Sequence, residues 1–237
     1  MSDIAALLQA VRHRIDQAVT AANRLPGSVQ LLAVSKTKPL ADVLAAAAAG
    51  QVHFGENYVQ EGVDKILATA SLPLADPLIW HFIGPLQSNK TRLVAEHFAW
   101  IHTVDRVRIA ERLSAQRPPQ LPPLQVCVQV NISGEDSKSG CAPEEAAALC
   151  AAVSTLPQLT LRGLMAIPEA DDNPEAQRRI FGRMQTIFAT IRRQPGIDSA
   201  TFDTLSMGMT HDLEAAIAEG ATLVRVGTGI FGERQYA

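Results

Sequence analysis

The chain has 237 residues, of which 47% are hydrophobic and 19% are charged, and its formal net charge is −3. This composition excludes disordered, collagen-like and low-complexity chains. The small net charge, without any block of lysine and arginine, argues against a partner with a nucleic-acid backbone. The three cysteines show no CxxC spacing, so they favour neither a disulfide framework nor a zinc site, and a reducing cytoplasm is expected.

The N-terminal segment predicts an amphipathic helix. Apolar residues between Ile4 and Val19 recur at helical intervals, unlike the continuous apolar core of a signal peptide. Ser2 is the expected N-cap of this helix. Elsewhere no apolar run approaches the roughly 18 residues that span a bilayer, so we expect a soluble protein without membrane contact.

Short apolar segments, rich in strand-forming residues, alternate with helical patterns over the rest of the chain. Eight strands are expected to begin near residues 29, 52, 78, 100, 125, 160, 201 and 222. Helical patterns cover 39–50, 58–70, 105–116, 143–153, 174–193 and 211–219. This alternation predicts right-handed parallel units that close into an α/β TIM (β/α)8 barrel, as one domain over residues 1–237. An open doubly wound sheet is the alternative.

Two connections have special compositions. The segment GIFGERQYA after the eighth strand is too short for a full helix, so the N-terminal helix is expected to cover that flank of the barrel. The segment RPPQLPPL at 117–124 is interpreted as a helix-to-strand connection. A polyproline ligand for another protein is the less favoured interpretation of the same segment.

Small and polar residues follow the last two expected strands, where TIM barrels usually bind phosphate groups. Their amides and hydroxyls can approach an anion closely. The candidate anion-binding residues are Ser206, Met207, Gly208, Gly227 and Thr228. Arg225 shares the side-chain direction of Gly227 along its strand, so it is expected to point toward the same mouth.

Lys36 ends the first expected strand, after an apolar run that would desolvate its amine. Such a lysine can become a nucleophile toward carbonyl groups, which prepares a Schiff base. On position alone, a lysine that extends into solvent is the simpler interpretation. A phosphate site across the same mouth favours a Schiff-base lysine instead, whereas Lys38 is expected to face solvent.

Six motifs in this order, AVSKTKP, HFGENYVQE, WHFIGPLQSNK, GLMAI, LSMGM and VRVGTGIFGER, closely resemble the pyridoxal-phosphate homeostasis protein family. The resemblance implies a fold-type III barrel for pyridoxal 5′-phosphate (PLP), like the N-terminal domain of alanine racemase with an extra N-terminal helix. It also implies that Lys36 carries PLP as an internal aldimine.

The same resemblance implies roles for further residues. Ser206, Gly227 and Thr228 resemble phosphate ligands. Asn57 and Met165 resemble neighbours of the ring, and His81 and Gly84 resemble lining of the mouth. Arg225 resembles the family arginine near the cofactor, facing either the phosphate or the pyridine nitrogen. An always-protonated guanidinium at that nitrogen would weaken the ring as an electron sink.

Related racemases use a tyrosine from an additional β domain as their second base, and this chain ends at Ala237. Its only tyrosines, Tyr58 and Tyr236, are not well placed by sequence for that role. The resemblance therefore implies a non-catalytic protein of PLP homeostasis and cofactor supply, with apo PLP-dependent enzymes as partners. Two alternatives are an amino-acid racemase and a class I aldolase that uses Lys36 on a phosphosugar.

Other candidates carry less weight. His53, His97, His102 and His211 lack metal-site spacing and are interpreted as packed or surface residues, so no metal is expected. Cys127 lies in an apolar strand and is expected to be inert. Lys138, in a polar loop after the fifth strand, is hypothesised to accept PLP transiently during transfer. The short barrel favours a monomer.

Overall fold

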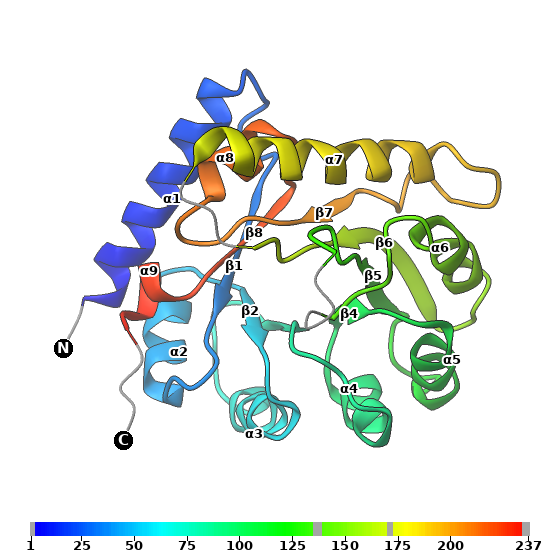
Figure 1. The fold of residues 1–237 in the computed structure, drawn as a ribbon. Coiled ribbons are helices and arrows are strands. Elements are labelled where there is room, and N and C mark those ends of the chain that lie inside the picture. Colours follow the sequence, from blue (N-terminus) through cyan, green and yellow to red (C-terminus); the bar gives the residue numbers. More distant parts are fainter. Residues whose placement is uncertain (1–2, 135–138, 170–172, 234–237) are drawn as a thin grey trace.

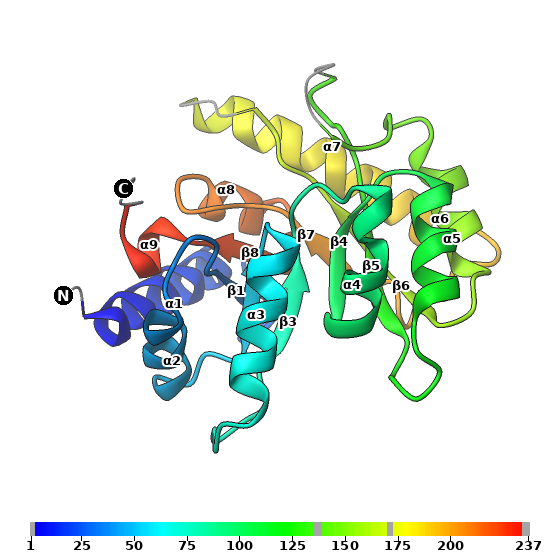
Figure 2. The same ribbon diagram turned by 90° about the horizontal axis from the view of Figure 1, so that it is seen from below.

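The computed structural model describes residues 3–134, 139–169 and 173–233. Eight parallel strands close into a barrel in chain order, because β1 pairs with both β2 and β8. Helices surround this barrel, as Figures 1 and 2 show. The strands are β1 (Gln30–Val34), β2 (His53–Glu56), β3 (Ile79–Phe82), β4 (Trp100–Val104), β5 (Leu124–Gln129), β6 (Leu159–Met165), β7 (Thr204–Ser206) and β8 (Leu223–Val226). The expected TIM barrel is confirmed, and the open doubly wound sheet is wrong.

Apart from α4 and α9, for which no helical pattern was given, the helices begin and end close to where the sequence patterns predict. They are α1 (Ile4–Ala21), α2 (Leu40–Ala48), α3 (Val59–Ala70), α4 (Thr91–His97), α5 (Val107–Gln116), α6 (Ala146–Ser154), α7 (Pro174–Arg192), α8 (Leu213–Ala218) and α9 (Thr228–Phe231). A short 3-10 turn at Ser88–Lys90 precedes α4. None of the described helices is long and apolar enough to cross a membrane.

Helix α1 covers the flank of the barrel beside β8, where α9 provides only one helical turn. It lies along α8 and α9, as expected for the spare N-terminal helix (Figure 1). The Asp3 carboxylate accepts a hydrogen bond from the Ala6 amide at 3.1 Å. Asp3 is therefore the N-cap, and the expectation that Ser2 caps this helix is wrong, because the helix begins at Ile4 and the residue directly before it forms the cap.

The barrel has two cores of different character. Most apolar side chains pack between the strands and the surrounding helices in one large cluster. Inside the barrel lie two small apolar clusters, formed by Leu32, Ile83 and Leu223 and by Trp100, Cys127 and Met165. Polar side chains are also fully or almost fully buried there, namely His81, His102, Ser206 and Arg225. The interior is thus a mixed core in which every buried polar group needs a partner.

The proline-rich segment at 117–124 connects α5 to β5, as interpreted from the sequence. Arg117 anchors this connection, because only 7% of the residue is exposed. Its guanidinium donates to the carbonyl oxygens of Ala95 and Phe98, at 2.7 Å each, and of Pro122 at 2.9 Å. A single arginine thereby satisfies three backbone acceptors around the end of α4.

We expect Arg117→Ala to lower the free energy of unfolding by about 3 kcal/mol, because three largely buried carbonyls lose their donor. Urea unfolding measures this loss. Arg92→Ala is the control, since the Arg92 side chain is 66% exposed and lies 3.7 Å from Glu96. That exposed pair should contribute less than about 0.5 kcal/mol. Equal losses in the two variants would contradict the anchoring role.

Candidate functional site

Lys36 lies two residues beyond the end of β1, and hydrogen bonds fix the backbone on both sides of it. The preceding Ser35 donates its hydroxyl to Glu56 Oε1 at 2.6 Å. The following Thr37 donates its amide to Glu61 Oε1 at 2.6 Å. Thr37 has a φ of +62°, a strained conformation for a β-branched residue that the surrounding contacts must maintain.

Lys65 joins these two anchors, and we call Ser35, Glu56, Glu61 and Lys65 the clamp. The Lys65 Nζ donates to the Ser35 carbonyl at 2.8 Å, to Glu56 Oε1 at 2.8 Å and to Glu61 Oε1 at 2.7 Å. Burial raises the pKa of the fully buried Glu56 carboxyl, while the Lys65 charge opposes that rise. The clamp holds the Lys36 segment by charge-assisted hydrogen bonds, the strongest kind in a protein interior.

Three histidines on neighbouring strands form a hydrogen-bonded chain inside the barrel. His53 Nδ1 lies 2.9 Å from His81 Nε2, and His81 Nδ1 lies 2.9 Å from His102 Nε2. His102 Nδ1 lies 2.9 Å from Ser206 Oγ. Burial lowers the pKa of His81 well below its usual value and that of His102 to about 3, so both rings are neutral at pH 7. His102 is a packed residue, as interpreted from the sequence, but the chain that it forms with His53 and His81 was not predicted.

Arg225 completes this interior network from β8. Its Nη1 donates to the carbonyl and hydroxyl oxygens of Ser206, at 2.8 Å each, and its Nη2 donates to the Ala166 carbonyl at 2.9 Å. Burial lowers the pKa of Arg225 to about 10, so the guanidinium still carries its charge at pH 7. A fixed cation therefore lies near the ends of β6, β7 and β8.

The loops after β7 and β8 present hydroxyl groups close together. Thr228 Oγ1 lies 3.2 Å from Thr210 Oγ1, and Thr228 is exposed. Gly208 has a φ of +91°, and a Cβ there would lie 2.5 Å from the Ala216 Cβ, so a glycine is required for packing. Thr210 was not predicted from the sequence, because it lies in a loop without a strand-end pattern.

A cavity of about 260 Å³ lies beside the carboxyl ends of β2, β3 and β5. Asn57 and Gln129 line it, and the buried Asn57 Oδ1 and Gln129 Oε1 accept no hydrogen bond from the described residues. The backbone of Gly84 lies very close to that of Asn57. A Cβ at Gly84 would lie 2.1 Å from the Asn57 carbonyl oxygen, so only glycine fits at this position. Gln129 is a functional candidate that sequence reasoning missed, although its inward position on β5 is a usable signal.

Three of the expected site residues, His81, Met165 and Met207, are fully buried in this structure. His81 lies between two histidines and stacks on Trp100 with a ring-centroid distance of 5.1 Å. Met165 packs in the interior cluster with Trp100 and Cys127. Met207 belongs to the outer core, and its amide donates to the Leu223 carbonyl.

Lys38 does not face solvent as expected. Its Nζ donates to the carbonyls of Phe231, Gly232 and Glu233 at 2.8–3.1 Å, because these carbonyls end α9 without helical partners. Tyr58 precedes α3 and is 56% exposed. Lys138 and Tyr236 lie outside the described residues, so their expected roles stay untested.

The buried cysteines have no reactive thiol. Burial raises the pKa of Cys127 and Cys141 to about 12, so both stay protonated at pH 7. All three cysteines are free. Within the described part of the chain, no group of three histidine, cysteine or acidic side chains is arranged to hold a metal ion.

We expect Lys65→Met to destabilise the protein by about 3–5 kcal/mol at neutral pH, because it leaves Glu56 buried without its cation. The loss should be smaller at acidic pH. A carboxyl whose pKa is higher in the folded state binds its proton better there, so stability falls as pH rises. Urea unfolding at about pH 5 and about pH 8 measures this slope.

The matched control is the double variant Glu56→Gln with Lys65→Met, which removes both charges and should lose most of the additional pH dependence. The same slope in the single and double variants would contradict the assignment of Glu56 as the buried partner.

Known proteins match this sequence over nearly its whole length, and the matches indicate the same family. Residues 7–235 match the family described as alanine racemase, N-terminal domain. The pyridoxal phosphate homeostasis protein of Pseudomonas aeruginosa is 57% identical, with 100% of this chain and 98% of that protein covered. The protein of the same name from Escherichia coli K12 is 55% identical, with 100% and 99% covered.

A solved structure of PipY from Synechococcus elongatus, with PLP bound, has a TM-score of 0.81 and is 39% identical. The match covers 97% of this chain and 100% of that one. The identities of full-length relatives and the family match support the same assignment. The chain belongs to the alanine racemase N-terminal domain family and, within it, to the pyridoxal phosphate homeostasis proteins.

Proposed function

We propose that this chain is a single PLP-binding domain that holds the cofactor without catalysing a reaction and supplies it to apo-enzymes in the cytoplasm. The observation that carries the proposal is full-length identity of 55–57% to pyridoxal phosphate homeostasis proteins. Its fit to this chain rests on Lys36, which the clamp holds at the mouth of the barrel. A monomer is the state we predict for this carrier.

The described residues fit a small, polar, anionic group. Asn57 Oδ1 and Gln129 Oε1 are buried acceptors beside the mouth, and neither has a partner among the described residues. The loops after β7 and β8 offer the Thr210 and Thr228 hydroxyls close to Gly227. The two hydroxyls can donate to an anionic group of the ligand, whereas the two amide oxygens can only accept from a hydrogen-bond donor of the ligand.

When bound, PLP supplies an aldehyde carbon and an electron-withdrawing ring. We assign Lys36 as the residue that holds it covalently, and Gly227 and Thr228 as phosphate ligands. Ser206, Asn57 and Gly84 contribute to the same site in this proposal. The clamp orients Lys36, because both neighbouring residues are fixed by Glu56 and Glu61. A preorganised amine avoids the entropy cost of ordering a flexible lysine on binding.

Arg225 favours binding over catalysis in this proposal. The guanidinium stays protonated at pH 7, because its pKa of about 10 lies well above that value. We assign it to the pyridine nitrogen, where a bound cation does not release a proton to the ring. A ring nitrogen left unprotonated withdraws electrons weakly, so carbanion chemistry is poorly supported.

A racemase would also need a second base opposite Lys36. Tyr58 is exposed and precedes α3, and the described residues contain no other tyrosine. His81 and His102 are neutral bases but are fully buried below the mouth. The candidates within the described chain are therefore poorly placed for proton abstraction from a substrate.

We expect Lys36→Ala to abolish the visible absorption band of protein purified with PLP, because the covalent attachment is lost. Lys38→Ala is the control, since Lys38 is engaged by the carbonyls after α9 and should leave the band intact. Absorption spectra before and after borohydride reduction measure the attachment. A colourless wild type that borohydride traps only with a phosphosugar would instead establish the aldolase.

We expect no exchange of amino-acid α-protons with deuterium oxide above the level of Lys36→Ala, because the described residues offer no well-placed second base. Proton NMR of alanine incubated with the PLP-loaded protein measures this exchange. PLP transfer to an apo-aminotransferase should proceed under the same conditions. Exchange that depends on Lys36 would contradict the carrier and establish a racemase.

A further inference from the structure

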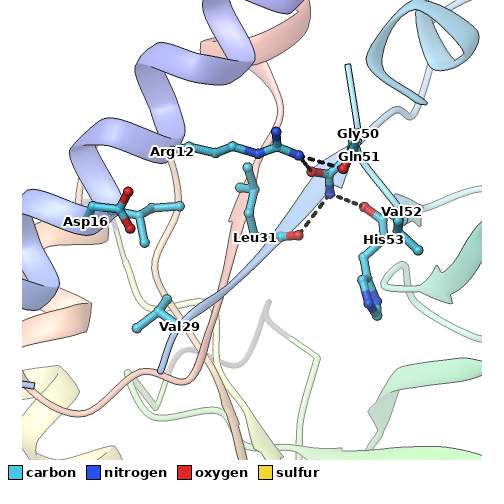
Figure 3. A pocket seen from close by; sticks show the side chains of 9 residues that line it. Arg12, Asp16, Val29, Leu31, Gly50, Gln51, Val52 and His53 are labelled. Carbon is cyan, nitrogen blue, oxygen red and sulfur yellow. Dashed lines mark hydrogen bonds between the residues drawn. The ribbon is translucent and has the colours of Figure 1, made fainter. Parts of the chain in front are cut away.

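The histidine chain connects the mouth of the barrel with a second cavity at its opposite end. This cavity has a volume of about 410 Å³ and lies between α1 and the amino ends of β1 and β2. His53 lines it, and Figure 3 shows the imidazole pointing away from Arg12. The histidine chain therefore runs from the solvent-accessible ring of His53 at one end to Ser206 and Arg225 at the other.

The surroundings of His53 leave it as the titratable end of the chain. Arg12 and Asp16 reach the cavity from α1, and His81 contacts His53 from β3. The Arg12 guanidinium is engaged by the carbonyls of Ala49 and Gly50 and by Gln51 Oε1. Two apolar residues, Leu31 of β1 and Val29 just before it, also line the cavity. Burial lowers the pKa of His53, but the ring is only partly buried.

The hydrogen bonds permit only two proton arrangements. A neutral imidazole carries one proton, so each ring donates through one nitrogen and accepts through the other. Two donors or two acceptors cannot face each other at 2.9 Å, so the tautomers of the three rings are coupled. Either every ring is protonated on Nε2, or every ring is protonated on Nδ1.

The two arrangements differ at Ser206. With Nε2 protonated, the Ser206 hydroxyl donates to His102 and accepts from Arg225. With Nδ1 protonated, Ser206 Oγ accepts from both His102 and Arg225, and its hydrogen must point to another acceptor. Only the second arrangement lets Ser206 donate to a group bound at the mouth.

We infer that His53, His81 and His102 form a proton wire that sets the direction in which the Ser206 hydroxyl donates. The inference rests on the proposed place of Ser206 in the PLP site. These three histidines are positioning residues, because they act on the ligand only through Ser206.

The change between arrangements conserves protons. One proton enters at Ser206 Oγ from the mouth, and the Ser206, His102 and His81 protons each cross one hydrogen bond. The positive charge appears on His53, which then carries protons on both Nδ1 and Nε2. Loss of the Nε2 proton to the lower cavity leaves the neutral chain in its second arrangement. Protonation of His53 and binding of a ligand acceptor at Ser206 therefore both favour the arrangement with Nδ1 protonated. Each of these two events makes the other more favourable.

Histidine-selective ¹⁵N NMR tests the wire, since it reports the tautomer of each ring directly. In protein stripped of PLP, at about pH 8, we expect His81 and His102 both to carry Nε2 protons. Lowering the pH until His53 is protonated should shift both buried rings to Nδ1 protonation. Adding PLP at the higher pH should produce the same shift, with severalfold tighter PLP binding at the lower pH.

His53→Phe removes the lower end of the wire and should abolish the pH-driven tautomer shift of His81 and His102. His97→Phe is the control, because His97 ends α4 outside the wire. If His53→Phe does not fold, the ¹⁵N NMR pH titration of the wild-type protein still tests whether the tautomers of His81 and His102 follow the protonation of His53. Different tautomers on His81 and His102, or tautomers that ignore the protonation of His53, would overturn the inference.

The PLP measurement separates this inference from the proposed function. A PLP absorption band without any tautomer shift would overturn the wire and leave the carrier intact. A pH-driven tautomer shift without any PLP band would support the wire itself and overturn the proposed cofactor site.

Discussion

The buried contact of Lys65 with Glu56 and Glu61 is the constraint on which the site depends. Together the two carboxylates fix the residues before and after Lys36. A buried ion pair of this kind adds little net stability, because desolvation offsets much of the attraction. Its contribution here is specificity, since it keeps Thr37 in a conformation that the isolated chain would avoid.

In the barrel interior, a larger network of buried polar groups likewise contributes conformational specificity. A core of branched apolar residues would fill this space without any unsatisfied donor or acceptor. Here the space between the two small apolar clusters contains neutral histidines, a serine and a cation, with the carbonyls of Ser206 and Ala166 as further acceptors. Such a network is stable only when all its members are paired, so each ring constrains the next.

Periodicity and chain order were sufficient for the barrel, because strand and helix patterns are local properties of the sequence. Lys36 was also found locally, since it ends an apolar strand. The histidine chain was missed because its members belong to separate strands, and their contacts depend on how neighbouring strands align. A usable signal was present in the inward-facing histidines of β2, β3 and β4.

Other differences also have local physical reasons. Met207 follows Ser206 directly, and successive strand residues point to opposite faces, so it packs outward against the helices. Lys38 was expected in solvent because the chain end that it contacts is nearly 200 residues away in sequence. The clamp was invisible for a related reason, since Ser35, Glu56 and Lys65 meet only after β1, β2 and α3 have assembled.

Arg225 shows how the interior network prepares the mouth for an anion. Its hydrogen-bond partners are neutral oxygens, and no ion pair of the described residues includes it. Burying a cation without a contacting carboxylate is costly, and this cost lowers the pKa of Arg225. An anion bound nearby would offset that cost, and the attraction is strong where water is excluded. The fold therefore maintains an incompletely compensated positive charge beneath the mouth. In the proposed site, a phosphate held by Gly227 and Thr228 would offset this charge through space and so stabilise the folded protein on binding.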